Sequence, residues 1–165
     1  MSMIANFLRV SRAELEEYLK DSDLLENRVY NEESNSEDSN PIDIDKSWEG
    51  ILFLLTGQNF QTTHHPLARI LFSGQIIDQE QDLGYGPAHF LTPEEVKDLN
   101  EKISKITTDN LRKKYDLKKM TELEIYPNNW EEENMSDYLI DYFEIVQEIF
   151  AEASKNNQAI ITFLN

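Results

Sequence analysis

The two ends of the chain are short and almost continuously apolar. Residues 3–10 show little alternation between apolar and polar side chains, and residues 159–164 are rich in β-branched and aromatic side chains. Both patterns are typical of buried strands. Because apolar terminal strands often pair with one another, we expect these two to be neighbours in one small sheet.

Capping patterns give the clearest helix starts. Ser11 has Glu14 three residues on, and this capping-box pair precedes an apolar face formed by Leu15, Tyr18 and Leu19. The sequence therefore predicts a helix that begins just after Ser11.

Four further helices follow from similar signals. The run Thr92-Pro-Glu-Glu95 combines an N-cap, a first-turn proline and a capping-box glutamate, and predicts a helix to about residue 106. Another helix is expected from Thr107 or Thr108, and a short one over 66–72. The longest should cover about 134–155, where a broad apolar stripe lies opposite acidic residues.

The block 41–57 contains a helix that is apolar nearly all round, with Trp48 at its start. Asp45 is a candidate N-cap for this helix, and Gly57 is a candidate for the residue that ends it. A helix that is apolar on all sides is normally buried on more than one side. We therefore expect it to lie at the centre of the core.

The remaining stretches complete the fold prediction. Residues 31–40 contain no apolar side chain and are interpreted as a flexible, solvated acidic loop, and residues 78–87 are acidic and rich in turn formers. Short extended segments are expected at 75–77 and 88–91. The sequence thus predicts an α+β fold: a single compact domain over residues 1–165, with a small sheet that includes both terminal strands and packs with several helices.

The composition is strongly acidic, with 32 Asp and Glu against 15 Lys and Arg and a formal net charge of −17. This charge is unevenly distributed. Residues 97–119 have a net charge of +4, and the remainder of the chain has a net charge of −21. We therefore expect a surface with two regions of opposite sign.

Residues 131–152 contain eight acids and no base. Within them, four acids at helical spacing share one face of the long predicted helix. They are either a docking surface for a basic partner or the ordinary solvated side of an amphipathic helix. The four are Asp137, Asp141, Glu144 and Glu148.

Common catalytic and metal-binding patterns are missing from the sequence. There is no cysteine, which excludes disulfides and Cys-ligated metals. The histidines His64, His65 and His89 lack metal-binding helical spacing, and there is no phosphate loop or nucleophile motif. We expect no metal and no cofactor, and we favour a non-enzymatic protein.

Charge also restricts the classes of partner. An acidic surface repels phosphate backbones and anionic membranes, and Tyr115 is the single aromatic residue in the basic segment 97–119. We expect neither nucleic acid nor a membrane as partner. With no signal or spanning segment predicted, the expected location is cytoplasmic; the oligomeric state stays open.

Two loop segments hold candidate site residues. Asp43 and Asp45 flank Ile44, and in extended backbone both carboxylates would point the same way. They could support acid–base or cation chemistry, or Asp45 could cap the next helix while Asp43 supports the turn or pairs with Lys46. The turn Gly84-Tyr-Gly-Pro87 would present Tyr85 to a ligand, although a tight turn explains it equally well.

Several segments, taken together and in order, resemble a known family. They are Ser2-Met-Ile4, Leu8-Arg-Val-Ser-Arg-Ala-Glu-Leu15, Ile42-Asp-Ile-Asp-Lys-Ser-Trp48, Leu55-Thr-Gly57, Gly84-Tyr-Gly-Pro-Ala88, Phe90-Leu-Thr-Pro-Glu-Glu-Val96, Ile125-Tyr-Pro127 and Trp130. This set is similar to the YfbM-like family of bacterial proteins and spans essentially the whole chain. Members often have arginine at the position of His89.

The resemblance implies a mixed α and β domain in the bacterial cytoplasm and no known activity, because the family is a domain of unknown function. A shared ligand or partner site would consist of the polar and aromatic residues within the matching motifs. These residues are Asp43, Asp45, Lys46, Trp48, Tyr85, Gly86, Pro87 and His89.

Two main classes of function follow from these observations; a third, a structural homo-oligomer, would need a large exposed apolar patch. The first is a non-enzymatic acidic interaction protein that docks a basic partner; an immunity-type protein that blocks a toxin is one form of it. The second is a small-ligand-binding or enzymatic domain in which the Asp43–Trp48 and Gly84–His89 segments form one pocket. Whether these two segments converge distinguishes the two classes.

Overall fold

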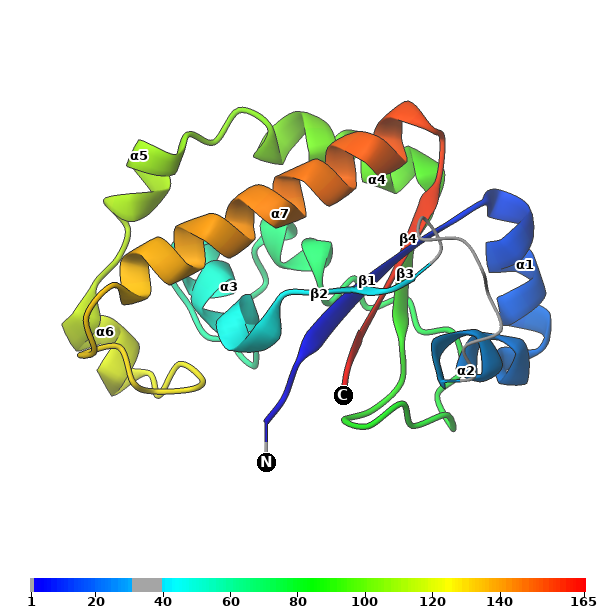
Figure 1. The fold of residues 1–165 in the computed structure, drawn as a ribbon, viewed down its shortest axis with the longest axis horizontal. Coiled ribbons are helices and arrows are strands. Elements are labelled where there is room, and N and C mark those ends of the chain that lie inside the picture. Colours follow the sequence, from blue (N-terminus) through cyan, green and yellow to red (C-terminus); the bar gives the residue numbers. More distant parts are fainter. Residues whose placement is uncertain (1, 31–39) are drawn as a thin grey trace.

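The antiparallel sheet has four strands in the order β2-β1-β4-β3 (Figure 1). The computed structural model describes residues 2–30 and 40–165, and these residues form seven α-helices besides the sheet. The α+β fold expected from the sequence is confirmed. The strands are β1 (Ala5–Val10), β2 (Ile42–Asp43), β3 (His89–Leu91) and β4 (Ala159–Leu164).

The terminal strands form the central pair of the sheet, which confirms the predicted pairing. Ala5 lies opposite Leu164, and Val10 lies opposite Ala159. β2 pairs with the other side of β1, and β3 pairs with the other side of β4. All six residues of β4 are buried, which explains why its sequence is apolar at nearly every position.

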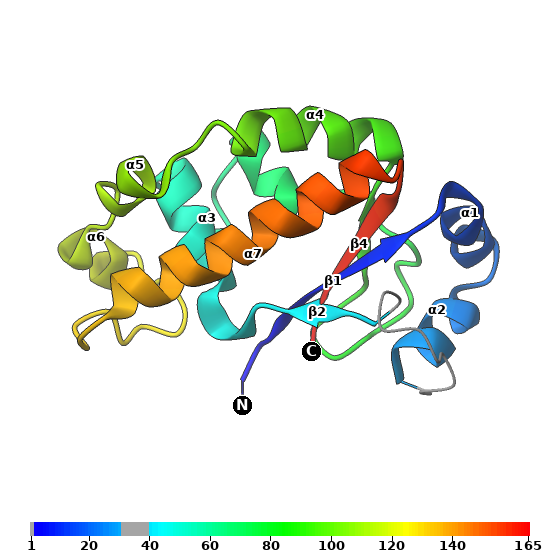
Figure 2. The same ribbon diagram turned by 45° about the horizontal axis from the view of Figure 1, so that its top comes forward.

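Helices cover both faces of the sheet (Figure 2). On one face lie the long helix α7 (Met135–Lys155), α3 (Trp48–Thr56) and α4 (Pro93–Ile103). There Phe7 of β1 packs edge-on against Phe150 of α7, with 6.3 Å between ring centroids. On the other face, α1 (Arg12–Lys20) and α2 (Ser22–Tyr30) form a second core with Leu8 and Val10 of β1.

Short elements connect these layers. The 3₁₀ helix η2 (Asp45–Ser47) leads into α3, and the 3₁₀ helix η3 (Pro66–Ile70) follows it. Between α4 and α7 the chain forms α5 (Thr108–Arg112) and α6 (Leu117–Glu122), at the end of the molecule opposite α1 (Figure 1). No helix among the described residues is both long enough and apolar enough to cross a bilayer.

The two predicted capping boxes and the predicted end of α3 at Gly57 are confirmed. Ser11 and Glu14 form both hydrogen bonds of a capping box at α1, and Thr92 and Glu95 do the same at α4. Gly57 ends α3 in a left-handed conformation, with φ of 75°. These helix ends are determined by side chains within a few residues, which is why the sequence alone predicts them.

Some predicted details are wrong. Asp45 does not cap α3: the cap position is Ser47, which makes no side-chain cap hydrogen bond. The expected strand at 75–77 is reduced to a single bridge between Ile76 and His89. Leu19, placed on the apolar face of α1, is 43% exposed.

Two predicted helices are shorter than expected. The helix expected over 66–72 is the 3₁₀ helix η3, which ends at Ile70, and α4 ends at Ile103 rather than near residue 106. The predicted acidic loop 31–40 lies outside the described residues except for Asn40.

The central helix α3 is buried from Trp48 to Leu54, as the sequence predicts. Where α3 approaches α7, Gly50 leaves no room for a side chain. A Cβ atom added to Gly50 would lie 2.6 Å from Leu139 Cδ2 and 2.7 Å from Trp130 Cη2. The close packing of α3 against α7 and Trp130 therefore depends on this glycine.

Replacing Gly50 with alanine should destabilise the protein by about 1–3 kcal/mol, because the added methyl group overpacks the core. In an unhindered helix interior the same change stabilises by about 1 kcal/mol, so the sign of the effect is diagnostic. Urea unfolding followed by circular dichroism measures it. In a Leu139→Ala background the cost should be smaller; an equal cost in both backgrounds would contradict this packing explanation.

Candidate functional site

The Asp43–Lys46 segment lies at the β2 edge of the sheet. Asp43 accepts a hydrogen bond from the backbone N–H of Asp45 at 3.1 Å, and Asp45 adopts a positive φ of 53°. The Asp45 carboxylate accepts a hydrogen bond from the Tyr138 hydroxyl of α7 at 2.8 Å. Burial and this hydrogen bond raise the pKa of Tyr138. Asp45 therefore ties the start of α3 to α7 and does not cap α3.

Trp48 is fully buried and contacts protein groups on several sides. Its Nε1 donates a hydrogen bond to the Met3 carbonyl at 3.0 Å, and its ring stacks on Tyr126 with 5.7 Å between centroids. Phe60 and Phe72 meet Trp48 edge-on at 5.3 and 5.8 Å. Trp48 is thus the centre of an aromatic cluster and has no exposed surface to offer a ligand.

Glu49, next to Trp48, is a buried acid that the sequence analysis did not single out. It is 4% exposed, and its carboxylate accepts hydrogen bonds from the backbone N–H groups of Tyr126 at 2.8 Å and Phe60 at 3.1 Å. Burial raises the pKa of Glu49, and these two hydrogen bonds oppose the rise. The sequence feature that could have identified Glu49 is its position as the lone acid in a helix that is apolar nearly all round.

The Gly84–His89 segment lies at the other edge of the sheet. Tyr85 and Pro87 border a small cavity of about 60 Å³ with His89 and residues of β4. The backbone N–H of Gly86 donates to Asp82 at 3.0 Å. This cavity is far below the roughly 300 Å³ of the smallest usual ligand pockets.

His89 is held by neighbours within this edge of the sheet. Its Nδ1 accepts a hydrogen bond from the Gly74 N–H at 3.2 Å, and its ring meets Phe72 edge-on at 5.6 Å. Burial lowers the pKa of His89. The neutral ring is therefore favoured, in keeping with its acceptor role.

The structure does not bring the two predicted segments together. β2 and β3 are opposite edges of the sheet, with β1 and β4 between them. None of the four hollows with volumes of about 300, 60, 240 and 280 Å³ within the described residues is lined by both segments. Phe72 contacts both Trp48 and His89 and so links one segment to the other. The role of the eight residues in binding stays a prediction.

Acidic and histidine side chains do not gather into a metal-ligand set: within residues 2–30 and 40–165 no group of three or more is placed to hold an ion. His65 instead caps η3, where its Nδ1 accepts from the Leu67 N–H at 3.1 Å. Asp82 accepts from the backbone N–H groups of Gly84 and Gly86, which lower its pKa.

Glu95 joins η3, the 75–77 segment and the start of α4. Its carboxylate accepts hydrogen bonds from Gln75 Nε2 at 2.8 Å and from the Thr92 N–H at 3.0 Å, and it forms an ion pair with Arg69. Burial alone would raise the pKa of Glu95. The hydrogen bonds from Gln75, Thr92 and Arg69 outweigh burial and lower the pKa from 4.5 to about 2.

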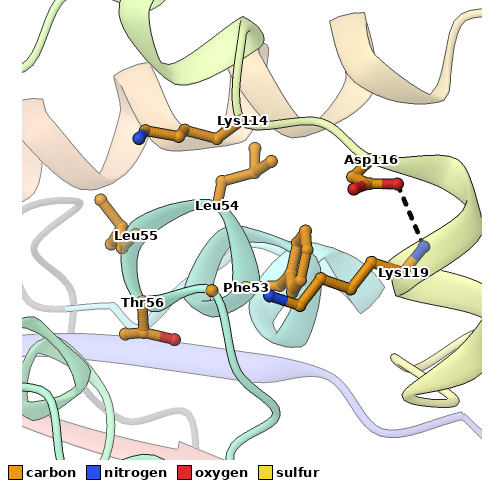
Figure 3. A pocket seen from close by; sticks show the side chains of 8 residues that line it. Phe53, Leu54, Leu55, Thr56, Lys114, Asp116 and Lys119 are labelled. Atoms are coloured by element: carbon orange, nitrogen blue, oxygen red, sulfur yellow. Dashed lines mark hydrogen bonds between the residues drawn. The ribbon is translucent and has the colours of Figure 1, made fainter.

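A larger hollow, of about 300 Å³, lies at the C-terminal end of α3 (Figure 3). Phe53, Leu54 and Leu55 face Lys114 and Lys119 there. Sequence reasoning missed this hollow because its residues come from two segments about 60 positions apart, with no local pattern to link them.

These features define a class: a small α+β domain whose antiparallel sheet is enclosed by helices on both faces. The chain belongs to the family of the domain of unknown function DUF1877, whose model matches residues 1–163.

A solved structure supports the same assignment. The chain is similar to the crystal structure of a protein of unknown function, YfbM from Escherichia coli, with a TM-score of 0.73 and 19% sequence identity over 98% of this chain and 99% of that chain. The expected YfbM-like family is therefore confirmed. A comparison with curated proteins found no match. Neither the family description nor the solved structure names an activity.

The hydrogen bond between Asp45 and Tyr138 should be a stabilising contact. Asp45→Ala and Tyr138→Phe should each destabilise the protein, with a coupling of about 1 kcal/mol in a double-mutant cycle. Tyr142→Phe is the matched control, because the Tyr142 hydroxyl has no hydrogen-bond partner among the described residues. Chemical unfolding of the variants measures these values, and additive effects would exclude the contact as a source of stability.

Acid should weaken the fold through Glu95. Because its folded-state pKa is lowered from 4.5 to about 2, its contribution is fully present above pH 4.5 and is lost as the pH falls toward 2. Glu95→Gln should be less stable at neutral pH by about 1–3 kcal/mol and should lose less stability between pH 4.5 and 2.

Urea unfolding at a series of pH values tests this, with Glu101→Gln as control. Glu101 is 73% exposed on the same helix and pairs with Lys105 at 3.7 Å. This control should keep the pH dependence of the unsubstituted protein. An unchanged dependence in Glu95→Gln would show that Glu95 is not the responsible group.

Proposed function

We propose that this protein is a non-enzymatic binding domain that docks a basic protein on the exposed acidic face of α7. The observation behind the proposal is a row of exposed carboxylates along this helix. They are Asp137, Asp141, Glu144, Glu148 and Glu152.

The row is long and continuous. Successive members are three or four residues apart, so they lie along one side of the helix. At a rise of 1.5 Å per residue, the row from Asp137 to Glu152 extends over about 22 Å. That length suits contact with several cations of a folded partner.

Most of these carboxylates have no cation of their own. Of the five carboxylates in this row, all within the described residues, Asp137 is the one that forms an ion pair, with Arg112 of α5. The others can therefore meet a partner's lysines and arginines without breaking an internal contact. A row of negative charges of this kind accelerates the encounter with a positively charged surface.

The proposal includes a cytoplasmic setting and leaves the identity of the partner open. An immunity-type role, in which the acidic face covers a basic toxin, is one form of it. A solvated helix face with no partner is the competing explanation, since surface helices are ordinarily charged on the side away from the core.

Neutralising the acidic face should weaken binding of a basic probe. A fluorescein-labelled peptide rich in lysine and arginine should bind the triple variant Asp141→Asn, Glu144→Gln, Glu148→Gln about tenfold more weakly than the unsubstituted protein at low salt. Fluorescence anisotropy measures the affinity, and added salt should reduce the difference.

The control removes the same charge from helices on the other face of the sheet. Glu16, Glu17 and Glu26 are exposed residues of α1 and α2, and changing all three to glutamine should leave the affinity nearly unchanged. Equal weakening in both triple variants would show that net charge, rather than the α7 face, attracts the probe.

A further inference from the structure

A groove with basic side chains lies between the C-terminal turn of α3 and the α5–α6 region (Figure 3). It consists of two adjoining hollows, of about 300 and 240 Å³. Leu54, Leu55 and Lys114 line both hollows, so the two are neighbours on the surface. The groove uses none of the α7 carboxylates of the proposed function.

The floor of the groove is apolar. Phe53 and Leu54 of α3 form part of it and are nearly fully buried. Leu55, Leu67 and Ile106 are only half-buried and leave apolar surface open to the groove. An occupant with apolar side chains would remove this surface from water.

The charged groups around the groove are mainly positive. Lys119 lies over the Phe53 ring, with Nζ 5.9 Å from the ring centroid. Lys114 has no ion pair among the described residues, and Lys105 pairs only with Glu101, at 3.7 Å.

The one acid in the lining of the groove is already engaged. The carboxylate of Asp116 caps α6 by accepting a hydrogen bond from the Lys119 backbone N–H at 3.1 Å (Figure 3). The groove is therefore a local positive site on a chain whose net charge is −17.

From this combination we infer that the groove binds an acidic peptide segment of a partner protein, anchored by two apolar side chains. Each hollow is no larger than the lower limit of about 300 Å³ for ligand pockets, whereas two adjoining hollows suit successive apolar anchors of one segment. Carboxylates between the anchors would meet Lys114 and Lys119.

Other occupants fit the groove less well. A second copy of this chain could offer the acidic row of α7 to the lysines, but the apolar side chains Leu139, Phe143 and Val146 of that helix are buried and supply no anchors. A nucleic acid would gain little base stacking, because Phe53 is buried beneath Lys119 and the basic segment offers only Tyr115. A short acidic segment meets mainly the nearby lysines, since charges beyond about 8 Å are screened at physiological salt.

The test uses a labelled peptide of the sequence Glu-Leu-Glu-Glu-Leu-Glu and its Leu-to-Ser counterpart. Fluorescence anisotropy with the full chain should show binding of the leucine peptide and at least about tenfold weaker binding of the serine peptide. The double variant Lys114→Glu, Lys119→Glu should bind the leucine peptide about tenfold or more weakly.

The matched control is Lys20→Glu, Lys97→Glu, which changes the net charge equally at exposed lysines outside the groove. It should bind the leucine peptide like the unsubstituted protein. Circular dichroism confirms that each variant is folded. Equal binding of the two peptides, or equal weakening in the two double variants, would overturn the inference.

Two further outcomes would assign the groove to another occupant and overturn the inference that it binds a peptide. One is binding of dodecanoate, a single-chain anion, without binding of the leucine peptide. The other is a dimer in sedimentation velocity that the Lys114→Glu, Lys119→Glu variant dissociates. Because the α7 triple variant leaves the groove intact, it should still bind the leucine peptide, which separates this result from the test of the proposed function.

Discussion

The pairing of β1 with β4 joins two strands that are almost the full chain length apart, and the other layers are built on this pair. Six residues of each strand lie opposite one another, and their side chains alternate between the two cores. Without β4, β1 would lose its longest partner and β3 would lose its strand neighbour. The helices on both faces would then have no continuous surface to cover.

Sequence reasoning was most successful where a structure depends on residues close together in the chain. The capping boxes at Ser11 and Thr92 and the stripe of α7 are local patterns, and each appears in the structure at the predicted position. Pairing of the terminal strands could be inferred because both segments are too apolar to lie on the surface. Asp45 was wrongly predicted to cap α3, because its hydrogen-bond partner, Tyr138, lies 93 residues away and cannot be recognised from the residues around Asp45.

The candidate site was harder to predict for the same reason. Motif residues such as Asp43 and His89 were grouped by resemblance, but the strand order places them at opposite edges of the sheet. Glu49 was not singled out, because one of the two backbone N–H groups that it accepts from belongs to Tyr126, 77 residues further along the chain. The groove near Lys114 likewise exists only after α3 and the α5–α6 region have packed together.

The position of β4 at the middle of the sheet also affects how the protein can be made. During synthesis β1 emerges from the ribosome long before β4, its central neighbour, which ends at Leu164. Until that residue has emerged, β1 exposes an unpaired edge of the kind that recruits other chains. The interval between the two strands is therefore a period in which a chaperone could be most useful to the nascent chain.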